Sequence, residues 1–327
     1  MNIQPSTLSI WAPVVAGVVT LLLTRLMLAS ALFAGIQDVP NGRSLHYTPT
    51  PRIGGLAMML SVLAAWLLLN EQTITWLLYG VVVLMLISLV DDLRDLSARV
   101  RLLGHLVVST GFILFGIPHM TFFWAALLVV GMVWMTNLYN FMDGANGLAG
   151  GMAAIGFGFY ALASGLAGDL NFALTNLVIV AASLAFLTFN FGRASVFMGD
   201  AGSIPLGFLA GAVGLLGWQR GLWPLWFPVV VFSSFVLDAT LTLLKRLLRG
   251  ERVWEAHREH YYQRLIQMGW SHQKTALVEY AIMLASGGVA MVAIHRPFIV
   301  VTGLLGFFLL ITLYLMRVVD FRWHNRG

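Results

Sequence analysis

The sequence predicts an all-α polytopic membrane protein, and three observations lead to this fold class. Hydrophobic residues make up 59 % of the 327 residues and charged residues only 10 %, whereas soluble proteins carry about 25 % charged residues. Apolar stretches long enough to cross a bilayer recur along the whole chain. The polar residues gather in a few short clusters between these stretches. Because no linker or low-complexity tract interrupts the pattern, we expect one integral-membrane domain over residues 1–327.

Eleven apolar stretches come close to the length of about 20 residues that a transmembrane helix needs. The first is not expected to be a cleaved signal peptide, because residues 1–8 contain no Lys or Arg. One stretch, 102–117, is short and bounded by Pro118 and His119. The predicted spans are residues 9–33, 53–70, 74–90, 102–117, 120–138, 148–168, 172–191, 203–218, 223–244, 275–294 and 298–316.

The Lys and Arg residues predict the orientation of these spans. With the N-terminus outside, the inner loops carry 16 of them and the outer loops carry two, Arg220 and Arg296. Cytoplasmic loops of membrane proteins are enriched in Lys and Arg. We therefore predict an outside (periplasmic) N-terminus and a cytoplasmic C-terminus. The net charge of +5 is explained by this asymmetry, and we expect a lipid bilayer and no nucleic acid as a partner.

Five polar clusters follow the first, third, fifth, seventh and ninth predicted spans, so all are expected at the cytoplasmic face. Two loops there, about 34–52 and 245–274, are long enough to take part in chemistry. The chain has no Cys, which excludes disulfides. The clusters are residues 38–55, 89–101, 137–151, 190–207 and 251–265.

The stretch "DDLRD" places three carboxylates, Asp91, Asp92 and Asp95, at the end of a predicted span. Carboxylates this close repel one another, and the helix macrodipole disfavours negative charge at a C-terminus. One interpretation is a solvated helix end neutralised by Arg94 and Arg99. The other is a divalent cation such as Mg²⁺, which prefers oxygen ligands.

The stretch "FMGDAGS" places Asp200 between Gly199 and Gly202. Small residues let backbone N–H groups approach a bound anion or metal–phosphate group. Taken alone, the pattern is also typical of a simple turn. The spacing of Ser203 and Gly207 is typical of helix packing through small residues.

The stretch "NLYNFMDGANGLAGG" repeats polar residues every three positions, at Asn137, Asn140, Asp143 and Asn146. Amide groups both donate and accept hydrogen bonds, which suits sugar hydroxyls, an N-acetyl group or a base edge. The alternative is that these residues only cap two helices around a glycine turn.

The stretch "HREHYYQR" gathers His257, Arg258, His260 and Arg264 within a basic loop. Arg can hold a diphosphate by bidentate hydrogen bonds. The alternative is that the loop carries only the positive charge expected of a cytoplasmic loop. A zinc site is a weaker alternative, because no Cys is available to complete a common ligand set.

The first loop adds Asn41, Arg43 and His46 ahead of a Pro- and Gly-rich segment that leads into the second span. Together the clusters offer carboxylates for Mg²⁺, basic groups for phosphates, and amides for a sugar or base. That combination at a membrane surface favours phosphoryl transfer between a nucleotide-activated donor and a lipid phosphate, a reaction that depends on positioning and charge neutralisation.

The same motifs resemble a known family, the polyprenyl-phosphate N-acetylhexosamine-1-phosphate transferases, which belong to glycosyltransferase family 4 and initiate bacterial envelope glycans. The matching pieces are "DVPNGRSLH…PRIGG", "DDLRD", "NLYNFMDGANGLAGG", "FMGDAGS", "LDATLTLLKR" and the basic loop. The resemblance implies transfer of a sugar 1-phosphate from a UDP-sugar to undecaprenyl phosphate, with release of UMP. It also implies a multi-pass protein of the bacterial cytoplasmic membrane that needs Mg²⁺, or Mn²⁺ in its place, and it leaves a homodimer open.

Residue roles follow from the resemblance by position. Asp91 and Asp92 match the essential aspartate pair, with Asp91 as the base or nucleophile toward the lipid phosphate, and Asp200 and Asn140 match metal-binding positions. The lipid phosphate is assigned to Asn41, Arg43 and His46. The substrate-binding assignments are Asn137, Asp143, Asn146, Asn190, Gly199, His257, Arg258, His260 and Arg264.

The basic loop "AHREHYYQR" lacks the three consecutive His of the muramoyl-pentapeptide enzymes. It is more similar to the loop of the O-antigen-initiating branch, which uses UDP-N-acetylfucosamine or related 6-deoxy-N-acetylhexosamines. An acidic residue at the position of Asp95 resembles the UDP-GlcNAc branch. The muramoyl-pentapeptide reaction stays as the alternative within the family.

A CDP-alcohol phosphatidyltransferase is disfavoured because its Asp-Gly-x-x-Ala-Arg motif is absent, and a transporter because no internal repeat is visible. Asp238 fits either a functional or a helix-packing role.

Overall fold

The computed structural model describes residues 5–30, 37–40, 45, 48–69, 74–94, 96–255 and 257–325 of the chain. Four residues singled out in the sequence, Asn41, Arg43, His46 and Asp95, lie outside the described residues. The roles assigned to them therefore stay predictions.

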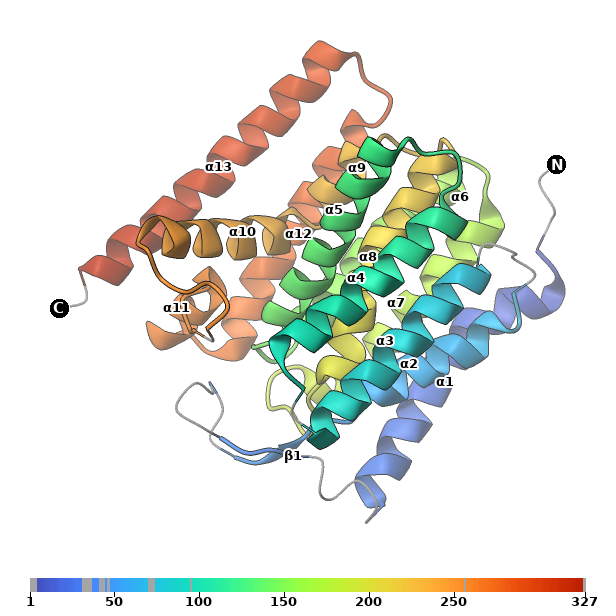
Figure 1. The fold of residues 1–327 in the computed structure, drawn as a ribbon, viewed down its shortest axis with the longest axis horizontal. Coiled ribbons are helices and arrows are strands. Elements are labelled where there is room, and N and C mark those ends of the chain that lie inside the picture. Colours follow the sequence, from blue (N-terminus) through green and yellow to red (C-terminus); the bar gives the residue numbers. More distant parts are fainter. Residues whose placement is uncertain are drawn as a thin grey trace.

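The described residues form a helical bundle with one short antiparallel ladder (Figure 1). In the ladder, β1 (Gln37–Asp38) pairs with β2 (Thr50–Pro51). The helices are α1 Thr7–Ala29, α2 Gly54–Trp66, α3 Ile74–Arg94, α4 Ala98–Gly116, α5 Phe122–Phe141, α6 Leu148–Leu166, α7 Leu170–Asn190, α8 Asp200–Gln219, α9 Trp226–Val231, α10 Ser233–Leu248, α11 Tyr261–Gln267, α12 His272–Ala293 and α13 Phe298–His324.

Nine helices among the described residues are long and apolar enough to cross a membrane, which confirms a multi-pass all-helical membrane protein. The stretch 102–117 is one of them, as α4. Two of the eleven predicted spans differ. Stretch 53–70 forms α2, whose 13 residues extend for about 20 Å, less than the hydrocarbon core of about 30 Å.

The predicted span 223–244 is not one continuous helix, because the chain breaks at Phe232 between α9 and α10. The Phe232 ring packs against the rings of Tyr139, Phe157 and Tyr160. As a result α10 runs crosswise to its neighbours α5 and α12 in Figure 1.

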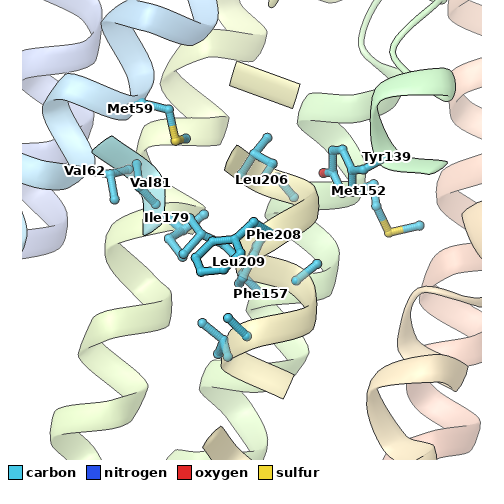
Figure 2. Packing of buried hydrophobic residues seen from close by; sticks show 14 of the residues in the cluster. Met59, Val62, Val81, Tyr139, Met152, Phe157, Ile179, Leu206, Phe208 and Leu209 are labelled. Atoms are coloured by element: carbon cyan, nitrogen blue, oxygen red, sulfur yellow. The ribbon is translucent and has the colours of Figure 1, made fainter. Parts of the chain in front are cut away.

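Helix α8 forms the centre of the bundle, since 89 % of its span is buried against 11 % for α13. Its small residues allow this close packing: a Cβ on Gly207 would lie 2.8 Å from the carbonyl oxygen of Met135 in α5. Figure 2 shows Phe208 and Leu209 of α8 packed with side chains of α6 and α7. By contrast, α13 extends away from the bundle in Figure 1.

The segments that precede α2 and α8 are joined by backbone hydrogen bonds. The N–H of Phe197 donates to the carbonyl of Pro51, and the N–H groups of Gly54 and Gly55 donate to the carbonyls of Phe197 and Met198. Two polar clusters that lie about 140 residues apart in the sequence are thereby held together.

Replacing Gly55 with Ala is expected to lower the unfolding temperature and the activity together. A Cβ there would lie 2.4 Å from the Cα of Gly202 and 2.5 Å from the carbonyl oxygen of Met198, and neither backbone atom can move easily. Overpacking of this kind costs about 1–3 kcal/mol. Gly111→Ala is the matched control, because no atom lies within 4 Å of its added Cβ. Identical thermal unfolding of both variants in detergent would contradict the expectation.

Candidate active site

Three of the predicted site residues meet at one end of the bundle, where α3 and α5 end and α8 begins. The Nδ2 of Asn140 donates to Oδ1 of Asp200 at 2.9 Å and to Oγ of Ser203 at 3.0 Å. One guanidinium nitrogen of Arg101 lies 3.2 Å from Asp91 and 3.6 Å from Asp200. Asp91, Asn140 and Asp200 therefore form one cluster around Arg101, which we call the carboxylate cluster.

Arg101 is the cation that compensates Asp91, and the sequence analysis did not identify it. Asp91 lies in the last turn of α3, where the helix dipole disfavours its charge, and its Oδ1 accepts the N–H of Leu96 at 2.7 Å. Arg94 and Arg99 are exposed and form no ion pair with a described residue. Spacing alone does not single out Arg101, because Arg99 also lies in the first turn of α4, which follows α3 after a three-residue connection.

Asp200 is the first residue of α8, where the helix dipole favours a carboxylate. Gly199 precedes it with φ of +70°, a conformation that L side chains rarely adopt. An added Cβ would also lie 3.1 Å from the carbonyl oxygen of Arg52. The glycine is thus required by the backbone, whatever further role it has with a ligand. Asp92 is exposed beside this cluster.

The Asn-rich segment divides into residues with different functions. Asn137 donates to the carbonyl of Val133 within α5. Asn146 donates to the carbonyl of Gly192, and Asn190 accepts the N–H of Gly147 at 2.7 Å, so both hold the loops before α6 and α8. The regular three-residue spacing thus does not place all four polar residues on one face.

Asp143 lies in the turn between α5 and α6. Burial, and next the carboxylate of Asp200, raise the pKa of Asp143 well above its ordinary value. Among the described contacts no hydrogen bond joins Asp143 to the carboxylate cluster, so the two interact only through their charges.

The basic loop contains many ion pairs, and these separate its Arg residues into two groups. Arg264 is only 3 % exposed on its side chain, pairs with Asp320 of α13 at 2.9 Å and lies over the rings of Tyr261 and Trp323. Arg258 forms no ion pair with a described residue. Acidic partners are found for Lys245, Arg246, Arg249, Arg252 and Arg264.

A pocket of about 360 Å³ lies beside the carboxylate cluster, between α4, α5, α10 and the basic loop. His257 and His260 form one wall, with ring centroids 4.8 Å apart. Burial, and next the charges of His260 and Arg246, lower the pKa of His257 to about 4. The polar and aromatic lining residues are Arg101, His105, Asn137, Asn140, Phe141, Trp254, Glu255, His257, His260 and Gln263.

His105 and Trp254 are lining residues that the sequence analysis did not assign to the site. His105 lies on α4 one helical turn beyond Arg101, so its place follows once Arg101 is known. Trp254 has no local signal, because only the folded loop brings it over the pocket.

The carboxylate cluster has the chemistry of a site for a hard cation. Among the residues that the structure describes, no three His, Asp or Glu side chains are grouped closely enough to hold a metal ion. The carboxylates of Asp91 and Asp200 nevertheless converge on one cationic group, the guanidinium of Arg101, and Nδ2 of Asn140 donates to Asp200. Oxygen donors of this kind fit Mg²⁺, which usually binds one or two carboxylates with water and phosphate.

Comparisons with known proteins identify the family. Residues 74–217 match the family described as glycosyl transferase family 4. A Bacillus subtilis (strain 168) protein named "Probable undecaprenyl-phosphate N-acetylglucosaminyl 1-phosphate transferase" is 31 % identical over 82 % of this chain and 80 % of its own length.

Two further relatives carry related names. The undecaprenyl-phosphate alpha-N-acetylglucosaminyl 1-phosphate transferase of Yersinia pestis is 27 % identical over 81 % of this chain and 78 % of its own. The phospho-N-acetylmuramoyl-pentapeptide-transferase of Staphylococcus saprophyticus is 27 % identical over 75 % of this chain and 85 % of its own. From its similarity over most of its length, we conclude that this chain belongs to the polyprenyl-phosphate N-acetylhexosamine-1-phosphate transferase family and is a phosphosugar transferase.

Proposed function

We propose that the protein transfers an N-acetylhexosamine 1-phosphate, or its 6-deoxy form, from a UDP-sugar to undecaprenyl phosphate and releases UMP. The observation that carries the proposal is the carboxylate cluster at the edge of the pocket, with Asp91 and Asp200 held around one cationic group. The names of the relatives support undecaprenyl phosphate as the acceptor and an N-acetylhexosamine 1-phosphate as the transferred group.

The proposed location is the bacterial cytoplasmic membrane, with the pocket facing the cytoplasm. If α2 and the pair α9–α10 each count as a crossing, the chain crosses the membrane eleven times, so its two termini lie on opposite sides. The distribution of Lys and Arg then places the N-terminus outside. The loops on the proposed cytoplasmic side carry 16 Lys and Arg residues, whereas the outer loops carry two. A soluble UDP-sugar can reach the pocket only from that side.

In the proposed reaction, a phosphate oxygen of the lipid attacks the phosphorus that carries the sugar. A new P–O bond forms, the P–O bond to the UMP phosphate breaks, and UMP leaves with the electron pair. Asp91 serves as base toward the lipid phosphate, or as nucleophile in a two-step scheme. Its carboxylate is already oriented by the N–H of Leu96 and by Arg101.

Mg²⁺, or Mn²⁺ in its place, is the proposed cofactor, with Asp91, Asp200 and Asn140 as the residues that would hold it. Such an ion neutralises charge on transferring phosphates. Nδ2 of Asn140 donates to Asp200 and Ser203, so Oδ1 would be the oxygen with which Asn140 binds the ion.

The polyprenyl chain is assigned to an apolar groove of about 410 Å³ between α5, α8 and the α9–α10 break. The break at Phe232 opens this groove, because α10 turns away from the direction of α9. The apolar walls suit an isoprenoid. A polar ligand would lose its hydrogen bonds to water there without replacing them, which costs free energy.

The sugar and the pathway are proposed from the basic loop at 257–264, which lacks consecutive His residues. We assign a 6-deoxy-N-acetylhexosamine or GlcNAc donor and a role in initiating O-antigen or a related envelope polysaccharide. The muramoyl-pentapeptide reaction is the second candidate, because a relative of that name matches 75 % of this chain.

A donor panel tests the proposal. Purified protein in vesicles with undecaprenyl phosphate and Mg²⁺ would receive UDP-GlcNAc, UDP-GalNAc, UDP-N-acetylfucosamine, UDP-N-acetylquinovosamine or UDP-muramoyl-pentapeptide, one at a time. We expect UMP release and a lipid diphosphate sugar with a UDP-N-acetylhexosamine, measured by product mass. A product only from the pentapeptide donor would favour the second candidate. Folded protein without product from any donor would refute the function.

A further inference from the structure

Asp238 of α10 forms a buried hydrogen-bonded centre that the proposed reaction does not use. The residue is 3 % exposed. Oδ1 accepts the N–H of Tyr261 at 2.9 Å and the hydroxyl of Thr242 at 3.2 Å, and Oδ2 accepts the N–H of Tyr262 at 3.1 Å. Oδ1 also lies 3.1 Å from Nδ1 of His260. Asp238 therefore contacts α11 and the basic loop, and it does not line the pocket beside the carboxylate cluster.

The hydrogen bonds to Asp238 determine which nitrogen of His260 carries a hydrogen. Both carboxylate oxygens already accept from backbone N–H groups, so the carboxylate acts as an acceptor on every side. A ring nitrogen that faces an acceptor must itself donate. The hydrogen of His260 therefore belongs on Nδ1, and Nε2 is left as the acceptor atom of the neutral ring.

The ring of His260 is also held in one plane. It stacks on Phe141 with centroids 6.2 Å apart and on Tyr262 with centroids 6.0 Å apart. With Nδ1 bound to Asp238 and the faces covered, Nε2 is the polar edge that His260 presents as a lining residue of the pocket.

His257 has the opposite arrangement. Its Nδ1 accepts the N–H of Glu259 at 3.3 Å, so the hydrogen of the neutral ring lies on Nε2. Burial keeps this ring neutral at pH 7, because it lowers the pKa of His257 to about 4. The two adjacent rings thus offer the pocket one donor and one acceptor.

We propose that Asp238 is a positioning residue that keeps the hydrogen of His260 on Nδ1, so that Nε2 of His260 accepts a hydrogen bond from the donor sugar. The matching ligand group is a hydroxyl or amide N–H, beside the donating Nε2–H of His257. This inference rests on the proposed function, since a sugar must enter the pocket. Asp238 acts through His260 and touches no substrate itself.

The first test is the position of the hydrogen, which does not depend on activity. Nitrogen NMR of ¹⁵N-histidine-labelled protein, with His260 assigned by comparison with His260→Gln, is expected to show N–H on Nδ1 in the wild type. In Asp238→Ala the signal should move toward the Nε2–H form, because the acceptor is gone. A wild-type His260 with its hydrogen on Nε2 would overturn the proposal, even if the Ala variant does not fold.

The second test is a double-mutant cycle on turnover. Asp238→Ala is expected to lower kcat/KM for the donor about 10- to 100-fold, as for other groups that orient a functional His, with little change for the lipid. In the His260→Gln background the same change should cost almost nothing. A full loss in that background would show that Asp238 only caps α11 and would refute the positioning role.

Thr242→Val is the matched control, because it removes a hydrogen bond to Asp238 and leaves the carboxylate against His260. Its donor kcat/KM should stay near that of the wild type, and a loss as large as that of Asp238→Ala would count against the proposal. A wild type that releases no UMP with any donor would refute the proposed function alone, since the hydrogen position is still measurable.

Discussion

Asp200→Asn is expected to lower turnover about 10³-fold, the equivalent of about 4 kcal/mol of lost charge stabilisation on the transferring phosphates. The amide keeps the size of the side chain, and its oxygen can still accept from Asn140, which now donates at 2.9 Å. What is lost is one of the two carboxylates that converge on Arg101. The measurement is UMP release over a range of Mg²⁺ concentrations, together with Mn²⁺ binding followed by electron paramagnetic resonance.

Asp169→Asn serves as the matched control, because Asp169 caps α7 at the opposite end of the bundle and pairs with Arg220. An Asn also caps helices well, so this variant should turn over at the wild-type rate. If Asp200→Asn kept near-normal rates at low Mg²⁺, its proposed role in cation binding would be wrong.

Arg258→Ala is expected to raise the donor KM about 10²-fold and to leave the lipid KM nearly unchanged. Arg258 is a basic side chain of the loop that forms no ion pair with a described residue, so its guanidinium can bind a diphosphate without breaking an existing pair. Removing one partner of a charge-assisted contact costs about 2–5 kcal/mol, which is consistent with this loss. Steady-state kinetics with each substrate varied in turn would measure it.

Arg252→Ala is the control for removing positive charge from the same loop. Arg252 is 69 % exposed and pairs with Glu255 three residues later, an arrangement that contributes little. Its KM values should match those of the wild type. Equal increases in donor and lipid KM for Arg258→Ala would contradict a specific contact with the diphosphate.

The helices and their polar ends could be predicted from the sequence because both depend on local composition. Within the part of the chain that the structure describes, nine stretches form helices of spanning length, and residues of three polar clusters meet at Asp91, Asn140 and Asp200. The prediction of one continuous span at 223–244 was wrong, because the hydropathy of this stretch gives no sign of the break at Phe232. At that break the Phe232 ring packs on aromatic rings of α5 and α6, which are distant in the sequence.

For the site too, the sequence identifies the candidate residues, and the tertiary structure shows which of them are in contact. Asp91, Asp200 and Asn140 stand out in the sequence as polar groups at the ends of apolar stretches, where each is costly and unlikely to occur by chance. The partner of Asp91 could not be chosen from spacing, since Arg94, Arg99 and Arg101 all follow within ten residues. Likewise the sequence gives no reason to assign different roles to Arg258 and Arg264, and only the ion pair of Arg264 with Asp320 of α13 distinguishes them.

By itself the sequence determined the membrane environment, the all-helical class and the family, because hydropathy, charge and short motifs are properties of neighbouring residues. The tertiary structure decided which cation meets which carboxylate, that Arg264 rather than Arg258 pairs with an acidic residue among the described residues, and that Asp238 faces His260 rather than the pocket. The physical reason is that hydrogen bonds and ion pairs act over a few ångströms, so they are determined only when distant helices pack together.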